Sequence, residues 1–300
     1  MEERAQITRL LDGRLHLHDG PIDLIIEAFG AANEVSAAYR AAAERFVTVL
    51  DELCAELSAL RQPASIGDPL PAGVIARRMV EAVAPYSERN FITPMAAVAG
   101  AVAEEILGSM TSVASLSRAY VNNGGDIALH LAPGERLVVG MVEQPDRPSL
   151  FGKVELHSSD LVRGVATSGW RGRSFSLGIA DAVTVLAGRA AMADAAATII
   201  ANAVDLPGHP AITRIPARDL APDSDLGDRL VTRGVGDLFS AEIAAALDAG
   251  VAAADSLVCE RLIHSAALHL RGETRVVGAN VAARHFDAES TNSNRSPVHA

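Results

Sequence analysis

The stretch DAVTVLAGRAAMADAAATIIANAV, residues 181–204, decides the fold class, because a buried strand runs directly into an alanine-rich helix. Residues 182–187 form an apolar run with β-branched side chains, which is typical of a strand buried on both faces. Residues 190–204 are rich in alanine and carry polar residues four positions apart, which predicts a helix. Since aromatic residues make up only 4% of the chain, such an alanine-rich core implies backbones that pack close together.

Strands and helices occur in clusters along the rest of the chain. Asp19-Gly20 predicts a tight hairpin turn, since glycine tolerates a positive φ. Thr93 is expected to cap a helix that has Pro94 in its first turn. The helices are expected at residues 36–60, 72–84, 93–108, 190–204 and 240–257, and the strands at 15–17, 22–27, 118–122, 126–131, 137–142, 153–157, 161–167, 182–187, 261–270 and 274–281.

Clustered elements, without strict alternation of strand and helix, predict an α+β fold with a largely antiparallel sheet. The absence of a linker signal favours a single domain over residues 1–286. The proline-containing and charged stretch 207–236 is expected to form a loop, and the polar residues 287–300 are expected to form a disordered tail.

Composition limits the function. The net charge is −11, which disfavours binding to a nucleic-acid backbone. The longest uncharged stretch, residues 90–103, is shorter than a membrane span, and the first residues lack an apolar signal core, so we expect a cytoplasmic protein that does not enter a membrane. Cys54 and Cys259 lack zinc-site spacing. Homo-oligomerisation stays open.

The first candidate site is the turn Asn123-Gly124-Gly125-Asp126. Two glycines let backbone N–H groups approach an anion, and the aspartate that follows can hold a hydroxyl, an amide or a metal. An ordinary Asn-Gly hairpin explains the same residues.

The second candidate is the glycine-rich stretch GVATSGWRGRS, residues 164–174. Thr167, Ser168 and Gly169 suit contact with phosphate at the end of a strand. Arg171 and Arg173 can form bidentate pairs with phosphate or carboxylate. The alternative is a loop with solvated arginines.

The third candidate is the stripe Asp194, Thr198 and Asn202 on the alanine-rich helix. A carboxylate and a hydroxyl one helical turn apart are hard oxygen ligands that suit Mg²⁺. A buried aspartate on such a helix needs a partner or an ion, whereas Thr198 can instead bond to its own helix backbone.

These segments, in this order, resemble the motifs of ApbE-like flavin transferases. The resemblance is carried by NNGGDI (122–127), GVATSG (164–169), AVTVLA (182–187) and ADAAAT (193–198), with PMAAVAGAVAEE (94–105) similar to the helix of the A-K-G motif. A shorter, uncharacterised branch of that superfamily is the closer match, which GPIDLIIEAFG (20–30) and SDLGDRLVT (224–232) also resemble. The resemblance covers roughly residues 15–270.

The resemblance implies a fold of paired T-fold-like halves with FAD in a cleft, where Mg²⁺ helps to split it and FMN is attached to a target protein. It implies Asp194 and Thr198 as metal ligands. Asn123, Gly124, Gly125, Asp126, Thr167, Ser168 and Gly169 would bind the flavin nucleotide, either FAD or FMN.

The chain departs from the transferase pattern in two places. Residues 170–182 lack the His-x-x-Asp-Pro-x-Thr-Gly segment, and Ala99 stands where the A-K-G lysine is expected. Asp181 and Arg173 occupy the gap and are the candidate catalytic residues, with a small anionic or nucleotide ligand. The sequence therefore predicts a Mg²⁺-dependent enzyme acting on a flavin nucleotide or related phosphate-bearing ligand. The alternative is a non-catalytic protein that binds a small anion or metabolite.

Overall fold

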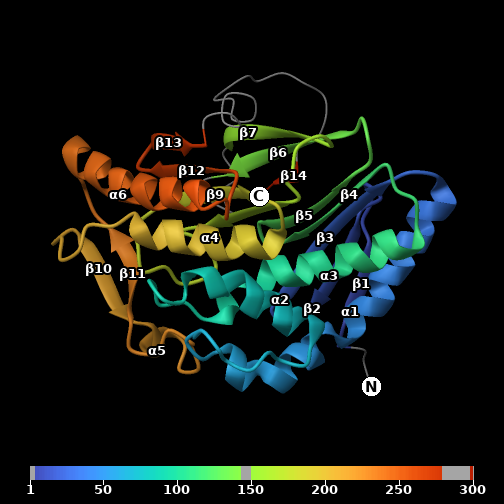
Figure 1. Cartoon of the computed structure of the whole chain (residues 1–300), viewed down its shortest axis with the longest axis horizontal. Helices are drawn as coiled ribbons and strands as arrows, with labels where there is room; N and C mark the ends of the chain where they lie inside the picture. The colour runs from blue at the N-terminus through green and yellow to red at the C-terminus, as the bar shows by residue number, and fades with distance from the viewer. Residues whose placement is uncertain (1–3, 143–149, 279–297, 300) are drawn as a thin grey trace.

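A nine-stranded antiparallel sheet forms the centre of the molecule (Figure 1). The computed structural model describes residues 4–142, 150–278 and 298–299. All neighbouring strands of this sheet pair antiparallel, which confirms the predicted α+β class with a largely antiparallel sheet. In spatial order the strands are β1 (Gln6–Arg9), β2 (Leu15–Asp19), β3 (Ile22–Phe29), β4 (Arg118–Asn123), β5 (Asp126–Leu131), β8 (Gly164–Ser168), β9 (Ala182–Ala187), β12 (Ser265–Leu270) and β13 (Glu273–Val277).

The chain repeats one order of elements along this sheet. In the first half, β2 and β3 are followed by helices and then by β4 and β5; in the second half, β8 and β9 are followed by helices and then by β12 and β13. The halves meet where β5 pairs with β8, at Ile127 opposite Val165 and Ala128 opposite Gly164. The main helices are α1 (Ala32–Leu60), α2 (Val74–Val83) and α3 (Val98–Val113) in the first half, and α4 (Ala190–Ala203) and α6 (Ser240–Cys259) in the second.

Each face of the sheet has its own core. The helices α1, α3, α4 and α6 lie in front of the sheet in Figure 1, and their apolar faces form the larger core with the inward side chains of the strands. The hairpin of β6 (Arg136–Val142) and β7 (Leu150–His157) builds a smaller core, in which Val139, Val154 and Leu156 cluster with Ile127 and Leu129. The sheet is therefore covered on both sides at its centre, where the two halves join.

Backbones approach very closely in the larger core, as the alanine-rich composition predicts. A Cβ added at Gly100 of α3 would lie 2.4 Å from the carbonyl oxygen of Ala190 in α4. A Cβ at Gly164 of β8 would lie 2.3 Å from the nitrogen of the same alanine. Since neither helix can retreat from the sheet without opening the core, these glycines set the distance between α3, α4 and β8.

The helix that begins near Thr93 differs from the expectation. A short 3₁₀ helix, η2 (Pro94–Ala97), precedes α3, and the Thr93 side chain caps neither. Its hydroxyl instead donates a hydrogen bond to Asp225 in a distant loop. Thr93 therefore stands at the N-cap position of η2 with Pro94 after it, but its side chain forms a tertiary contact with Asp225 and no capping bond.

The loop expected at residues 207–236 was also wrong. It contains β10 (Ile212–Pro216), the short helix α5 (Ala217–Leu220) and β11 (Leu230–Val235), and the two strands pair antiparallel. These strands are short and lie among prolines and charged residues. They show no clear alternation of apolar and polar residues from which a strand could be predicted.

Two short strands, β1 and β14, lie near the ends of the chain. The expected tail, residues 287–300, lies outside the described residues except for β14 (Val298–His299), which pairs parallel to β6. The strand β1 was not anticipated, since all four of its residues are exposed. A remaining 3₁₀ turn, η1 (Ala84–Tyr86), follows α2.

One helical stretch, Pro94–Val113, has the length and apolar composition to cross a membrane. In this protein it belongs to the core: α3 packs against α1, α4 and β5, and Ala101, Val102 and Ile106 are fully buried. We interpret it as the central helix of the first half.

Candidate functional site

The two halves join where β5 pairs with β8, and we call this junction the seam. Four elements from both halves meet at one end of it. The first half contributes the β4–β5 turn and the start of α3. The second half contributes the end of β8 and one face of α4. Ser168 lies on the same sheet face as Ala166, which packs in the helix-side core, so its side chain is directed toward the helices.

Asp194 of α4 is bound to the N-terminus of α3. Its Oδ2 accepts a hydrogen bond from the Gly100 N–H at 3.0 Å, and the Ala99 N–H also stabilises the carboxylate. In return, Glu104 of α3 accepts a hydrogen bond from the Ala191 N–H at 2.8 Å, in the first turn of α4. Each helix thus supplies a carboxylate to free N–H groups at the start of the other.

Asp126 faces Asp194 across the seam, and the two carboxylates interact. Burial raises the pKa of Asp126 to about 7, against the opposing effects of the Thr167 N–H and the Arg173 guanidinium. Burial, followed by the negative charge of Asp126, raises the pKa of Asp194 well above its ordinary range. Ionising both carboxylates at once is therefore unfavourable, and a shared proton or a bound cation would offset the repulsion.

The donor set fits Mg²⁺ at this point. Asp194 forms no ion pair with a basic side chain of residues 4–142 and 150–278, and the Thr198 hydroxyl, one turn further along α4, forms no hydrogen bond within the same residues. Mg²⁺ is commonly bound by one or two carboxylates while it keeps several waters. No cluster of three or more His, Cys, Asp or Glu side chains with metal-site geometry occurs in the described chain, so a cation here would take few protein ligands.

The glycine turn is a tight hairpin connection. Gly124 has φ +67° and Gly125 has φ +117°, and the Gly125 N–H donates to the Asn122 side chain at 2.8 Å. The buried Asn123 donates from its side-chain amide to the Ala99 carbonyl at 3.2 Å. The turn is therefore fixed to the start of α3, which places Asp126 beside Asp194.

Arg173 lies over this turn. A Cβ built at Gly124 would lie 1.8 Å from Nη2 of Arg173, so the guanidinium occupies the space that a side chain would need. The positive charge of Arg173 is close enough to lower the pKa of Asp126. The structure thus brings Arg173 into the cluster.

Asp181 does not join the cluster. The side chain is buried, and its Oδ1 accepts hydrogen bonds from Trp170 Nε1 at 3.1 Å and Arg171 Nε at 2.6 Å. Its Oδ2 accepts a bond from the Arg271 N–H at 2.7 Å. Both oxygens of Asp181 are therefore engaged in hydrogen bonds that anchor the loop, and its predicted catalytic role stays a prediction.

The Thr167 hydroxyl points away from the acidic pair, and its predicted contact with a ligand stays a prediction. This hydroxyl is hydrogen-bonded to Thr184 at 2.9 Å, on the sheet face opposite to Ser168, because successive residues of a strand point to opposite faces. Only its backbone N–H reaches Asp126. Gly169 is buried where a Cβ would lie 2.5 Å from the Asp181 carbonyl oxygen, which makes close packing sufficient reason for this glycine.

The third member of the α4 stripe is used structurally. Asn202 accepts a hydrogen bond from the Leu177 N–H at 2.9 Å and one from Ser176 at 3.3 Å. These bonds fasten the segment after Arg173 to the end of α4. The stripe therefore divides into Asp194 and Thr198 at the seam and Asn202 in a loop anchor.

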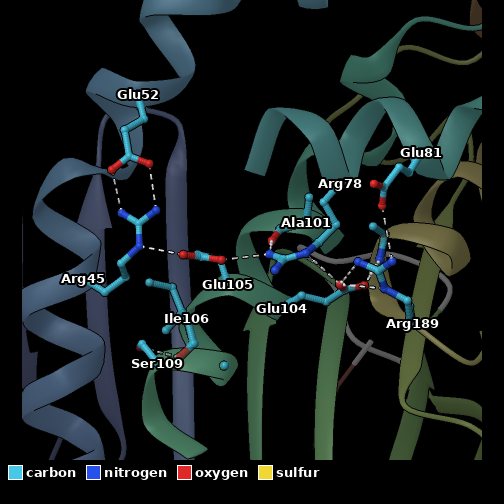
Figure 2. A network of polar contacts seen from close by, with 12 residues as sticks. Arg45, Glu52, Arg78, Glu81, Ala101, Glu104, Glu105, Ile106, Ser109 and Arg189 are labelled. Atoms are coloured by element: carbon cyan, nitrogen blue, oxygen red, sulfur yellow. Dashed lines mark hydrogen bonds and ion pairs between the residues drawn. The ribbon is translucent and has the colours of Figure 1, made fainter. Parts of the chain in front are cut away.

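A ladder of alternating charges links α1, α2 and α3 to Arg189, which directly precedes α4 (Figure 2). Arg45 of α1 joins Glu52 to Glu105, Arg78 of α2 joins Glu105 to Glu104, and Arg189 joins Glu104 to Glu81. Glu104 connects the ladder to α4 through Ala191. The sequence shows these residues only as scattered charges on helix surfaces, so their arrangement could not be anticipated.

Comparison with known proteins identifies the family of the chain. The family model described as AbpE bacteria matches residues 7–276. A UPF0280 protein of Methanopyrus kandleri is 40% identical over 128 residues, 43% of this chain and 48% of that protein. A UPF0280 protein of Methanococcoides burtonii is 41% identical over 120 residues, 39% of this chain and 48% of that protein. The chain thus spans about half the length of these curated relatives.

A solved structure, the flavin transferase ApbE from Vibrio cholerae, aligns with 91% of this chain and 97% of its own chain at 13% identity, with a TM-score of 0.36. The family model covers most of the chain, and this confirms the resemblance predicted from the sequence. The chain belongs to the ApbE-like family described as AbpE bacteria.

Proposed function

We propose that this protein is a Mg²⁺-dependent enzyme that acts on a flavin nucleotide, FAD or FMN, or on a related phosphate-bearing ligand. One observation carries the proposal: the buried Asp126 carboxylate lies close enough to Asp194 for its negative charge to raise the pKa of Asp194, and burial raises the pKa of both. A divalent cation between them would offset that repulsion and allow both to ionise.

The residues suit distinct tasks. Asp126 and Asp194 would hold the cation, and the Thr198 hydroxyl is placed to add a ligand from the same face of α4 as Asp194. When bound, Mg²⁺ supplies neutralisation of phosphate charge and polarisation of phosphorus. The exposed turn at Gly124 and the Ser168 side chain would contact the ligand, which would bind between the halves. We further propose a cytoplasmic location.

A second candidate function is binding without chemistry. Among the two predicted catalytic residues, the buried Asp181 is fully hydrogen-bonded, and only the exposed Arg173 stays accessible. Arginine remains protonated in proteins and cannot act as a general base. The loss of a free acid at residue 181 favours a protein that senses or carries its ligand.

The test measures AMP released from FAD by the purified protein, with Mg²⁺ and with a chelator. The enzyme proposal predicts Mg²⁺-dependent AMP release that Asp194→Asn abolishes. The matched control is Asp248→Asn, on the exposed face of α6, which should release AMP like the wild type. FAD binding without AMP release would favour the second candidate; neither binding nor release would refute both for flavins.

A further inference from the structure

The Arg173 guanidinium lies over the β4–β5 turn although it forms no hydrogen bond with the residues that the structure describes. Within residues 4–142 and 150–278 it forms no hydrogen bond or ion pair, and it is exposed. A flexible arginine of this kind would ordinarily extend into water. Here the guanidinium lies against Gly124, where any Cβ would clash with Nη2 and Cζ, at 1.8 Å and 2.9 Å.

The loop that carries Arg173 is anchored by contacts of the residues just before it. Trp170 and Arg171 both donate to the buried Asp181 carboxylate, and the Arg171 guanidinium stacks 4.8 Å from the centre of the Trp170 ring. The Trp170 N–H donates to the Ala180 carbonyl at 3.0 Å, and the Gly172 N–H donates to the Gly169 carbonyl at 3.1 Å. These contacts hold Arg171 and Gly172, the two residues before Arg173, and the Arg173 side chain extends over Gly124.

The resulting charge arrangement selects among ligands. The Arg173 guanidinium lies near Asp126, whose carboxylate interacts with that of Asp194, so one basic and two acidic groups would meet anything that enters the seam. A cation placed between Asp126 and Asp194 leaves Arg173 available for an oxyanion attached to that cation. Guanidinium binds phosphate oxygens in a bidentate geometry, which a neutral ring system cannot reproduce.

We propose that Arg173 determines specificity by binding the phosphate oxyanion of a cation-chelated ligand, with diphosphates as the preferred class. Gly124 provides the space for the guanidinium, and Asp181 is the positioning residue that holds its loop. The proposal rests on the proposed function, since it takes the cation at Asp126 and Asp194 as given. It adds the group that is recognised and the residue that recognises it.

The experiment uses the full chain and two separate titrations. Mn²⁺ binding, followed by the EPR signal of free Mn²⁺, reports the cation site alone. Binding of inorganic diphosphate in the presence of saturating Mn²⁺, followed by calorimetry, reports Arg173. Arg173→Gln is compared with Arg233→Gln, an exposed arginine of β11.

Arg173→Gln is expected to weaken diphosphate binding about tenfold, because a charge-assisted pair is lost. The same change should leave Mn²⁺ affinity equal or higher, because a positive charge near Asp126 is removed. Arg233→Gln should change neither titration. A loss of both affinities in Arg173→Gln would show a merely structural role and overturn the proposal.

The remaining outcomes separate this proposal from the proposed function. Wild-type protein that binds Mn²⁺ but not diphosphate, or an Arg173→Gln variant with unchanged diphosphate affinity, would overturn the role of Arg173 and leave the cation site standing. Wild-type protein that binds no Mn²⁺ would overturn the proposed function, and the Arg173 proposal with it.

Discussion

The Asp194 carboxylate of α4 accepts a hydrogen bond from the Gly100 N–H of α3, with 3.0 Å between Oδ2 and nitrogen. The two residues belong to different halves of the chain, so the position of this carboxylate depends on both. The reciprocal bond from Ala191 to Glu104 fixes the pair of helices in the same register. Hydrogen bonds between α3 and α4 therefore hold the acidic side chains in position at the seam. The stability of the protein and its binding of a cation or ligand can be tested separately.

The helix crossing at Gly100 gives the first prediction. Gly100→Ala places a Cβ 2.4 Å from the Ala190 carbonyl oxygen and should destabilise the protein by about 1–3 kcal/mol. Gly108→Ala is the matched control on the same helix, because a Cβ there meets nothing within 4 Å and helix propensity favours alanine by up to about 1 kcal/mol. Urea unfolding measures both, and equal effects would contradict the close crossing.

The second prediction concerns pH. Burial raises the pKa of Asp126 to about 7 in the folded protein, so folding favours its protonated form. In a chelator, the free energy of unfolding should therefore fall as pH rises from about 4 to about 7, with a slope from this group of at most about 1.4 kcal/mol per pH unit. Asp126→Asn should reduce this fall. Urea unfolding across the pH range checks it, and a wild-type stability that rises over the interval would contradict the account.

The third prediction tests the anchor of the arginine loop. Asp181→Asn removes the charge partner of Arg171 in a buried setting and should cost about 3 kcal/mol. Asp228→Asn breaks the exposed ion pair with Arg218 and should cost less than about 1 kcal/mol. Thermal unfolding compares the two variants. A small effect at Asp181 would mean that the loop is held by other contacts.

The fourth prediction separates backbone strain from the displacement of Arg173. Gly124 and Gly134 both have positive φ, +67° and +86°, so alanine at either should cost about 1–2 kcal/mol. Only Gly124→Ala also displaces the guanidinium, since a Cβ at Gly134 meets nothing within 4 Å. Gly124→Ala alone should therefore weaken diphosphate binding in calorimetry. Similar diphosphate affinities in the two variants would count against the position of Arg173.

Much of the architecture could be predicted because its signals are local. The buried strand and alanine-rich helix of residues 181–204 correspond to β9 and α4 within a residue. The paired glycines also predicted the β4–β5 turn, since two adjacent positive φ values need glycine. The strands β10 and β11 could not be predicted in the same way. They pair with each other across an intervening charged segment, which leaves no local signal in the sequence.

The site was less accessible to sequence reasoning than the fold. Whether Thr167 or Ser168 faces the helices depends on strand register, which the sequence does not fix locally. The role of Asp181 depends on Arg271, 90 positions away, whose N–H takes one carboxylate oxygen. Asp194 was found because an acidic residue on an alanine-rich helix needs a partner, although its hydrogen bond to Gly100 could only come from the structure.

The most direct test of the central claim is thermal unfolding with and without Mg²⁺ for wild type, Asp194→Asn and the control Asp248→Asn. A cation bound only by the folded state must raise the melting temperature. The account predicts that Mg²⁺ raises it for wild type and Asp248→Asn and leaves Asp194→Asn unchanged. No increase in wild type, or an equal increase in Asp194→Asn, would contradict a divalent-cation site at the seam.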